Sequence, residues 1–379
     1  MRKKGAGKTH FMEVAKNLTA LGNDLLVVLP GYKPLKKDHN SLNIIYVPTF
    51  RKSIISYLIY QLLQPVFLFF LILKFKPDVV YTREGLFDVF AAAVTKALRK
   101  PFVLEVNGII EDELLFRGIN INIIKMIRIM ESFTFKLSDR MVCVTEGISK
   151  LLVNKYNVKE KNVFVISNGV NTDLFHPIDK LECRKKLGLP EDDFIVGFVG
   201  TFAPWQGLIF LLKAVKEIKE AGDEVSSNIS FILVGDGEQE MTLRTLAREY
   251  GIESLVHFAG RVEYEEVVYW INAFDVAVAP FTRERNSLCG LSPLKMYEYL
   301  ACGKPVIASD IEGIRDIVGV NKCGLLFNPN DVNELIGKII NLYSNKDSFL
   351  NIGEVCSNYV KTNYSWRNIA MILEYALKN

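Results

Sequence analysis

The sequence predicts an α/β protein of two doubly wound, Rossmann-like domains, and three observations lead to this fold class. The chain has 379 residues, which is more than one average domain contains. Short apolar runs rich in β-branched residues alternate with stretches of helical periodicity, the pattern of βαβ units around a buried parallel sheet. This series occurs twice, separated by the polar segment 176–193. We therefore expect one parallel sheet in each half of the chain.

The expected strands define the two domains. In the first half they lie at 25–29, 43–48, 78–82, 102–107, 141–145 and 163–167, and in the second half at 194–200, 229–235, 256–260, 276–280, 305–309 and 324–327. We assign residues 1–178 to an N-terminal domain, residues 190–363 to a C-terminal domain and residues 364–379 to a final amphipathic helix. Glycine-containing turns at the carboxyl ends of parallel strands bind phosphates, and such turns follow three strands of the second half. A cleft between the domains is the expected substrate site.

The segment GAGKT (5–9), near the start of the chain, is similar to the end of a phosphate-binding P-loop. Gly7, Lys8 and Thr9 match the last part of the pattern G-x-x-x-x-G-K-[ST], but Arg2 occupies the position of its first glycine. A P-loop also follows a β-strand, and no strand pattern precedes this segment. We therefore exclude a P-loop hydrolase.

The charge of the chain is uneven. Its net charge is +3, but residues 1–180 carry 26 Lys and Arg against 16 Asp and Glu, whereas residues 181–379 carry 20 against 27. The positive half favours an anionic partner such as a membrane surface, a phospholipid or nucleic acid, with solvated lysines as the alternative. We expect an anionic membrane surface and no nucleic acid.

The cysteines and the first residues indicate the cellular compartment. The six cysteines are scattered without a CxxC pair, and the chain opens without an apolar signal segment. We expect reduced thiols in a cytoplasmic protein, with neither a disulfide framework nor a zinc site.

The segment 54–75, IISYLIYQLLQPVFLFFLILKF, is long enough to span a bilayer, which takes about 20 apolar residues. It contains Gln61, Gln64 and Pro65, and a strand pattern follows it directly. We expect one or two helices that pack on the domain and expose an apolar face to lipid, so that the protein is peripheral to the inner face of the membrane. Insertion across the bilayer is the alternative.

Four segments carry a family resemblance. They are SNGVNTDLFHP (167–177), VGTFAPWQGLIFLLKA (199–214), ILVGDGEQEMTLRTLAREYGIESLVHFAGRV (232–262) and GLSPLKMYEYLACGKPVIASDIEGIRDIV (290–318). In sequence, order and spacing they resemble the GT-B glycosyltransferases, in particular the retaining family 4. The resemblance implies the GT-B fold and an enzyme that transfers a sugar from a nucleotide sugar.

The resemblance also implies a donor site built from the turns of the C-terminal domain. Its expected residues are Gly200, Thr201, Gln206, Gly235, Asp236, Gly237, Arg261, Arg283, Arg285, Ser292, Pro293, Leu294, Lys295 and Glu298. The sequence has no DxD motif, so we expect neither a metal nor another cofactor. Helix dipoles and protein hydrogen-bond donors would then stabilise the leaving diphosphate.

Two of these residues are expected to act in the chemistry. We expect a helix with Ser292 as its N-cap and Pro293 as its first residue. The amides of Leu294 and Lys295 would then point at the diphosphate, and the Lys295 ammonium would add a cation. Glu298 matches the second acid of the family's paired-glutamate motif, which accepts hydrogen bonds from the ribose. A surface lysine and a solvated acid are the alternatives.

The sequence departs from the family pattern at three positions. Gly290 stands where the first acid of the motif is expected, and Thr201 and Gln206 stand where the family often has an Arg and a Lys that clamp the donor phosphates. Charge-assisted hydrogen bonds are roughly twice as strong as neutral ones, so other cations would have to take this role. The candidates are Arg283, Arg285 and Lys8.

In the N-terminal domain, the resemblance implies a Gly-rich loop and a helix start at GAGKTH, after a first strand that the sequence lacks. Gly7, Lys8 and His10 are the expected acceptor-side residues, with a structural role for His10 as the alternative. Asn107 matches a cleft-facing His or Asn of the family and is the third expected catalytic residue, and Gly108 beside it would allow close approach. The final helix is expected to cross back onto this domain.

The leading hypothesis is a retaining transferase that moves a hexosyl or N-acetylhexosaminyl residue from a nucleotide sugar to a lipid-linked or polysaccharide acceptor, with UDP favoured. No nucleophile stands out, so the resemblance implies front-face attack assisted by the leaving phosphate. Gly290, Thr201 and Gln206 favour one alternative, a non-catalytic module that binds a sugar nucleotide or a partner. A sugar-nucleotide epimerase of GT-B shape would need a further acid or histidine in the cleft, and we identify none.

Overall fold

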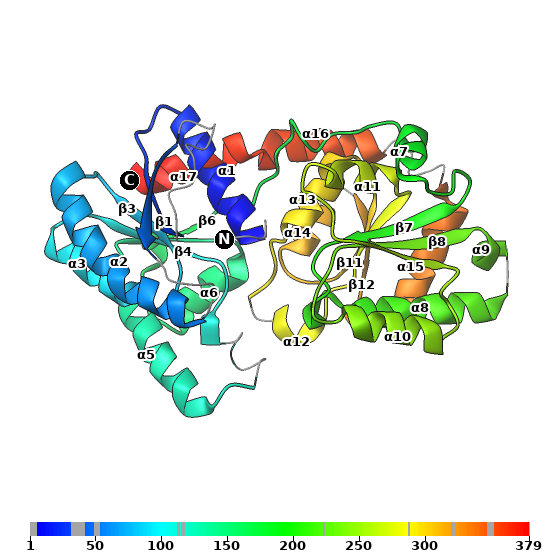
Figure 1. Cartoon of the computed structure of the whole chain (residues 1–379), viewed down its shortest axis with the longest axis horizontal. Coiled ribbons are helices and arrows are strands. Elements are labelled where there is room, and N and C mark those ends of the chain that lie inside the picture. Colours follow the sequence, from blue (N-terminus) through cyan, green and yellow to red (C-terminus); the bar gives the residue numbers. More distant parts are fainter. Residues whose placement is uncertain are drawn as a thin grey trace. The chain divides into compact units, whose positions relative to one another are not determined.

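The computed structural model divides the chain into two compact units (Figure 1). The N-terminal unit consists of Met1–Ser167 with Trp366–Asn379, and the C-terminal unit is Asn168–Ser365. The structure describes residues 6–31, 42–48, 54–111, 114, 118–222, 224–286, 289–319, 323–346 and 352–378.

The N-terminal unit is built on a parallel sheet in the order β3-β4-β5-β6. These strands are β3 (Val80–Arg83), β4 (Phe102–Val106), β5 (Arg140–Cys143) and β6 (Val163–Val165). In the described residues, β1 (Leu26–Gly31) and β2 (Asn43–Pro48) form a separate parallel pair. The helices are α1 (Ala6–Ala20), α2 (Ile54–Phe75), α3 (Asp88–Ala97), α5 (Ile121–Leu137), α6 (Glu146–Asn154) and α17 (Trp366–Lys378), with a 3₁₀ turn η1 (Glu160–Asn162).

The C-terminal unit contains a six-stranded parallel sheet in the order β12-β11-β10-β7-β8-β9. Its strands are β7 (Phe194–Val199), β8 (Ile229–Val234), β9 (Val256–Gly260), β10 (Val276–Ala279), β11 (Val306–Ser309) and β12 (Gly324–Phe327). Its helices are α7 (Lys180–Leu187), α8 (Leu208–Ala221), α9 (Glu224–Ser227), α10 (Glu240–Glu249), α11 (Val267–Ala273), α12 (Arg283–Asn286), α13 (Leu294–Ala301), α14 (Ile314–Val318), α15 (Val332–Ser344) and α16 (Ile352–Tyr364), with a 3₁₀ turn η2 (Pro204–Gln206). Each predicted strand therefore corresponds to a strand of the structure, within a few residues.

The predicted end of the N-terminal domain at residue 178 is wrong by eleven residues, because unit 1 stops at Ser167. The segment that follows is held by the C-terminal unit. The Asn168 amide donates to the Ser292 hydroxyl at 3.0 Å, Val170 pairs with Ser365, and the Phe175 ring is fully buried in the C-terminal core. The final helix α17 belongs to the N-terminal unit, where the Asn23 side chain donates to Glu374 at 2.9 Å.

Gly7 and Lys8 do not lie in the predicted loop, and Gly5 lies outside the described residues. Gly7 and Lys8 lie in the first turn of α1, and the Gly7 carbonyl accepts a hydrogen bond of 2.9 Å from the Arg83 guanidinium. Segment 54–75 forms the single helix α2, with Pro65 inside it. In the part of the chain that the structure describes, none of the helices combines the length and apolar content needed to cross a bilayer.

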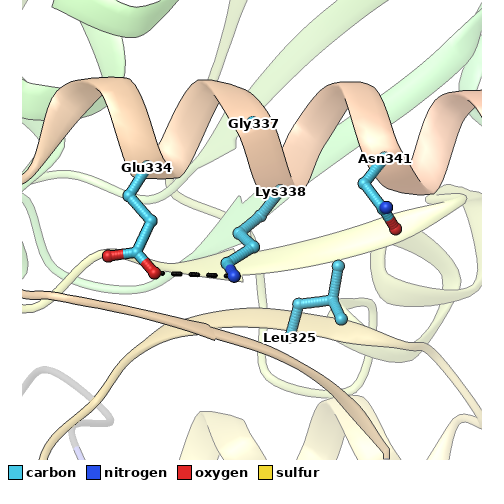
Figure 2. Close-up of a pocket in the computed structure, with 5 residues that line it drawn as sticks. All are labelled: Leu325, Glu334, Gly337, Lys338 and Asn341. Carbon is cyan, nitrogen blue, oxygen red and sulfur yellow. Dashed lines mark ion pairs between the residues drawn. The ribbon is translucent and has the colours of Figure 1, made fainter.

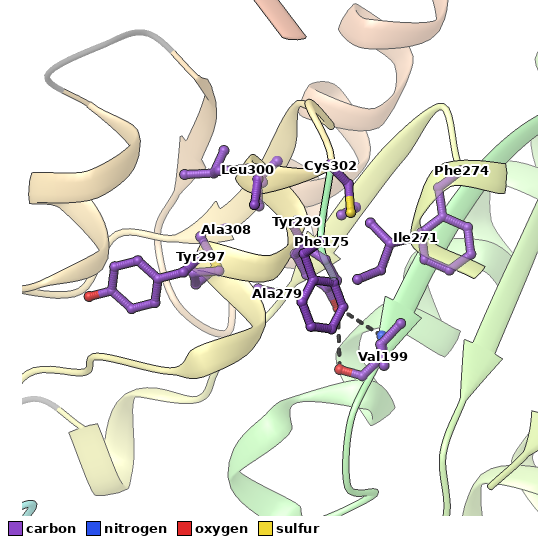
Figure 3. Close-up of a cluster of buried hydrophobic side chains, with 14 of the residues drawn as sticks. Phe175, Val199, Ile271, Phe274, Ala279, Tyr297, Tyr299, Leu300, Cys302 and Ala308 are labelled. Atoms are coloured by element: carbon purple, nitrogen blue, oxygen red, sulfur yellow. Dashed lines mark hydrogen bonds between the residues drawn. The ribbon is translucent and has the colours of Figure 1, made fainter. Parts of the chain in front are cut away.

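The C-terminal sheet is covered by apolar side chains on both faces. One cluster includes Phe175, Ile271, Phe274 and Tyr299, most of whose neighbours are fully buried (Figure 3). The Tyr299 hydroxyl accepts a hydrogen bond of 2.7 Å from the Val199 amide and donates one of 3.3 Å to the Val199 carbonyl. These bonds fix α13 to the carboxyl end of β7, which matters for the site described below.

The expectation of reduced cysteines is wrong for one pair. Cys323 and Cys356 form a disulfide with their Cα atoms 5.7 Å apart, and the four other cysteines are buried outside this disulfide. Their separation of 33 residues in the chain gave no pattern from which the pairing could be inferred.

Candidate functional site

The order in which successive strands are added to the C-terminal sheet reverses at β7. Strands β8 and β9 lie on one side of β7, and β10, β11 and β12 lie on the other. Doubly wound sheets bind ligands at such a switch point, beyond the carboxyl ends of the strands. Here the loops after β7 and β10 meet: the Thr282 amide donates to the Trp205 carbonyl at 3.1 Å, and a Cβ on Gly207 would lie 1.7 Å from the Pro280 carbonyl oxygen.

The predicted glycine turns after β7 and β8 pack directly on each other. A Cβ on Gly235 would lie 1.9 Å from the Gly200 carbonyl oxygen, and one on Gly237 would lie 2.5 Å from the Phe202 carbonyl oxygen. Larger side chains would therefore separate the two loops. The structure brings Gly200, Thr201 and the 235–237 turn together at the switch point, as the sequence predicts.

Lys295 lies under the loop that follows β7. Its ammonium donates a hydrogen bond of 2.7 Å to the Gln206 side-chain carbonyl and lies 3.7 Å from the centre of the Phe198 ring. A Cβ on Gly200 would be only 2.6 Å from this ammonium. Burial holds the Lys295 pKa well below its usual value, although nearby Glu298 acts in the opposite direction. The alternative of a surface lysine is therefore wrong.

Glu298 lies one turn further along α13 and is also buried, so it is not a solvated acid. The Tyr264 hydroxyl donates to one of its oxygens at 3.1 Å. Burial raises the Glu298 pKa to about 7, against the lowering effects of Tyr264 and Lys295. Tyr264 was not predicted, since it precedes α11 and no sequence motif links it to α13.

The predicted N-cap of α13 is wrong. The helix begins at Leu294, and Pro293 occupies the capping position without a side-chain hydrogen bond. The Ser292 hydroxyl instead accepts from the Asn168 amide and lies 2.8 Å from the Tyr297 hydroxyl, so it is already engaged. The first amides of an α-helix have no intrahelical acceptor, so those of Leu294 and Lys295 remain suitable for an anionic ligand.

Gly290 is in the left-handed region, with φ of 65°. A Cβ there would lie 2.8 Å from the Glu312 carbonyl oxygen. A glutamate like that of the family pattern therefore does not fit this backbone without rearrangement.

Of the three arginines predicted for the donor site, the structure describes the side chains of Arg261 and Arg283. Arg261 lies 3.5 Å from Asp236, so these two expected donor residues pair with each other. Arg283 opens α12 with an exposed side chain, and the side chain of Arg285 lies outside the described residues. Lys295 is thus the predicted cation that contacts the β7 loop.

In the N-terminal unit, the predicted residues His10 and Asn107 meet at an acid that was not predicted, Glu105. His10 Nε2 lies 2.8 Å from Glu105 Oε1, and the Asn107 side chain donates to the same oxygen at 2.5 Å. The Tyr81 hydroxyl donates to the other oxygen, and Arg83 Nε is 3.8 Å from Oε1. Burial alone would raise the Glu105 pKa, but these partners, His10 foremost, lower it to about 2.

This buried network gives His10 a structural role. Its ring is packed edge-on against Trp366 of α17 at 5.2 Å, and it lines a small cavity of about 10 Å³ with Tyr81 and Glu105. Lys8 is half-buried beside it, and a Cβ on Gly108 would meet open space, as close approach by a ligand requires. A charged residue inside the apolar strand FVLEV was the one sequence signal for Glu105.

A wider pocket of about 240 Å³ lies elsewhere on the C-terminal unit (Figure 2). It is lined by Leu325 of β12 and by α15, on which Lys338 pairs with Glu334 at 3.5 Å. It includes none of the predicted site residues. Among the described residues, no cluster of three or more His, Cys, Asp or Glu side chains is arranged to hold a metal ion. Metal independence stays a prediction.

Two family models together match almost the whole chain. The model described as Glycosyltransferase Family 4 matches residues 7–174, and that described as Glycosyl transferases group 1 matches residues 179–364. An uncharacterized glycosyltransferase of Methanocaldococcus jannaschii is 24% identical over 377 residues, covering 96% of this chain and 92% of that protein. The D-inositol 3-phosphate glycosyltransferase of Stackebrandtia nassauensis is 31% identical over 199 residues, covering 51% of this chain and 44% of that protein. In the second case the match spans less than half of the relative's length.

Among solved structures, HepE of Anabaena in complex with UDP and glucose superposes with a TM-score of 0.78 at 18% identity, covering 100% of this chain and 97% of that one. At this identity the likeness shows the fold. The predicted fold class and family are thus both confirmed: the chain is a GT-B glycosyltransferase and belongs to glycosyltransferase family 4.

Proposed function

We propose that this glycosyltransferase is a retaining enzyme that moves a hexosyl or N-acetylhexosaminyl residue from a UDP-sugar to a lipid-linked or polysaccharide acceptor at the cytoplasmic face of the membrane. The observation that carries the donor part is the position of Lys295. Its ammonium lies against Gly200 and Gln206 at the switch point, where a diphosphate is expected. UDP is favoured because HepE of Anabaena, which has the same fold, was solved with UDP and glucose.

Each residue of this site has a role that follows from its chemistry. The Gly200 and Gly235 turns admit the diphosphate close to the backbone, and the α13 amides with Lys295 oppose its negative charge. Glu298, buried and held by Tyr264, accepts hydrogen bonds from the ribose hydroxyls. The contacts of the α13 amides and Lys295 with the diphosphate would strengthen as negative charge develops on this leaving group.

The transfer itself needs no protein nucleophile. The C1–O bond to the diphosphate breaks and its electron pair stays on the diphosphate oxygen. The acceptor hydroxyl oxygen forms the new bond to C1 on the same face of the sugar, and its proton passes to a phosphate oxygen. Lys295 lowers the energy of this step by stabilising the departing charge.

A non-catalytic module that binds a sugar nucleotide is the second candidate. It is favoured by the neutral side chains of Thr201 and Gln206 and by the missing acid at Gly290. In such a protein the donor would bind without being consumed.

A thermal-shift panel of UDP, GDP, ADP and their common sugar conjugates tests the proposal. A ligand at a hundred times its dissociation constant stabilises its protein by about 2.7 kcal/mol. We expect a uridine nucleotide to shift the wild type and a Glu249→Ala control, whose side chain is exposed on α10, but not Glu298→Ala. If no nucleotide shifts the wild type, the donor site is wrong. If a UDP-sugar binds but no UDP is released with any lipid-linked or polysaccharide acceptor, the non-catalytic candidate is correct.

A further inference from the structure

Helices α2, α3 and α5 are neighbours on the outside of the N-terminal unit. The connections β3-α3-β4, β4-α5-β5 and β5-α6-β6 join adjacent parallel strands, and such connections are right-handed, so their helices cover the same face of the sheet. Helix α3 packs between α2 and α5 (Figure 1). The faces of α2, α3 and α5 that point away from the sheet therefore form one continuous surface.

The outward face of α5 is apolar. Its exposed residues Ile123, Met126, Ile129 and Phe133 follow each other at intervals of three or four, which places them along one side of the helix. Met126 and Ile129 are 55% and 58% exposed. The inward face of the same helix is buried through Ile124, Ile127 and Phe135, so the fold already uses a separate stripe for its core.

The outward face of α2 carries a second apolar stripe. Leu62, Val66, Phe69, Phe70 and Leu73 are exposed at helical spacing, and Phe70 is 63% exposed. Phe90 of α3, itself exposed, lies on the helix between the two stripes. Apolar side chains of this number on one surface mark an interaction site rather than scattered surface residues.

The exposed charged side chains of α2 and α5 are all basic. Helix α2 contains no Asp or Glu, and the one acid of α5, Glu131, is 4% exposed and accepts from the Ile110 amide. The exposed charged side chains on the two helices are Lys74, Lys125, Arg128 and Lys136, of which Arg128 pairs with Glu111 at 3.5 Å. Lys74 and Lys136 each lie over a neighbouring phenylalanine ring, so ammonium groups border the apolar stripes directly.

We propose that this surface, formed by the exposed apolar residues of α2, α3 and α5 with their flanking lysines, docks on the surface of an anionic lipid bilayer. The apolar side chains would enter the boundary between headgroups and acyl chains, and the lysines would contact lipid phosphates. The proposal rests on the proposed function, since it names the membrane as the place where a lipid-linked acceptor is met. A second copy of the chain fits this surface less well, because two such faces would bring lysines against lysines.

Co-sedimentation of the full chain with vesicles tests the proposal. We expect binding to vesicles of phosphatidylcholine with phosphatidylglycerol, at least tenfold weaker binding to pure phosphatidylcholine, and weakening in 0.5 M salt as screening predicts. Ile129→Glu and Phe70→Glu, one on each stripe, should each weaken binding at least tenfold. Met241→Glu is the matched control, because Met241 is an exposed apolar residue of the C-terminal unit.

The outcomes separate this proposal from that of the donor site. Every variant is first tested for the nucleotide-induced thermal shift, because the proposed donor site is built from residues of the C-terminal unit. Loss of vesicle binding with an unchanged shift supports the docking surface. The docking surface would be overturned if the wild-type protein did not bind anionic vesicles, or if the variants bound them as well as the wild type. Either result counts whether or not nucleotide binds. A concentration-dependent dimer that Ile129→Glu dissociates would assign the surface to a second copy instead.

Discussion

The Nζ atom of Lys295 donates a hydrogen bond of 2.7 Å to the side chain of Gln206. A lysine of α13 thus contacts an uncharged residue of the loop that follows β7. The family resemblance leads one to expect a lysine on this loop. The chain therefore keeps a lysine at the loop after β7 but supplies it from a different element. The neutral residue at 206 need not weaken the site, because its side chain orients the Lys295 Nζ.

Replacing Lys295 by methionine, which keeps much of the aliphatic volume, tests this role. We expect the nucleotide diphosphate to bind roughly 10- to 100-fold more weakly, since a hydrogen bond to a charged group is worth about 1.5–3 kcal/mol. Titration calorimetry measures the change. Lys213→Met, at an exposed position on α8, is the control and should bind like wild type. Equal affinities for the two variants would remove Lys295 from the donor site.

Glu298→Gln should change how stability depends on pH. The Glu298 pKa is about 7 in the folded protein and near 4.5 when unfolded, so ionisation disfavours the folded state. The stabilisation that the protonated acid provides is complete below pH 4.5 and is lost as the pH rises through 7. We expect the wild type to lose roughly 2 kcal/mol more than Glu298→Gln between pH 5 and pH 8.

Urea unfolding at the two pH values measures this difference. Asp88→Asn is an informative comparison, because burial also raises the Asp88 pKa to about 7 but Asp88 lies in the N-terminal unit. Both variants should flatten the pH dependence, whereas only Glu298→Gln should weaken nucleotide binding. An unchanged pH dependence in Glu298→Gln would mean that this carboxyl is ionised throughout the range.

Sequence patterns predicted the fold well because buried parallel strands are read from local apolar runs. Every strand in the part of the chain that the structure describes was predicted, and so was the short helix that carries Lys295 and Glu298 one turn apart. The errors concern partners distant in the chain. Ser292 looks like an N-cap locally, but Asn168 and Tyr297 take its hydroxyl.

The N-terminal network was missed for the same reason. Glu105 draws its partners from α1, β3 and the end of β4, which only the tertiary fold brings together. The disulfide between Cys323 and Cys356 likewise depends on how α16 packs, and no spacing rule foretells it.

Gly290→Glu is expected not to restore the paired acids of the family pattern. A side chain at φ of 65° is strained, and its Cβ would lie 2.8 Å from the Glu312 carbonyl oxygen. Such strain costs about 1–3 kcal/mol. Gly222→Ala separates the two causes, because Gly222 has φ of 64° but open space around its Cβ. We expect Gly290→Ala and Gly290→Glu to lower the free energy of unfolding by more than Gly222→Ala. A Gly290→Glu protein as stable as wild type and with tighter donor binding would contradict this account.

Glu105→Gln is expected to destabilise the N-terminal unit and to make it less sensitive to acid. Removing one partner of a buried ion pair costs about 3–5 kcal/mol, because His10 and Arg83 are left near a neutral amide.

The Glu105 pKa is about 2 in the folded protein against 4.5 unfolded, so its ionised form stabilises the fold above pH 4.5. That contribution is lost as the pH falls towards 2. The difference in the free energy of unfolding between wild type and Glu105→Gln should therefore shrink by about 2 kcal/mol from pH 6 to pH 3.

Guanidinium unfolding followed by tryptophan fluorescence suits this measurement, since Trp366 packs against His10. Glu160→Gln, at an exposed acid of the same unit, should show no such narrowing. A constant gap would mean that the Glu105 carboxylate is not held by its basic neighbours, and the buried network would then be a packing contact without an electrostatic role.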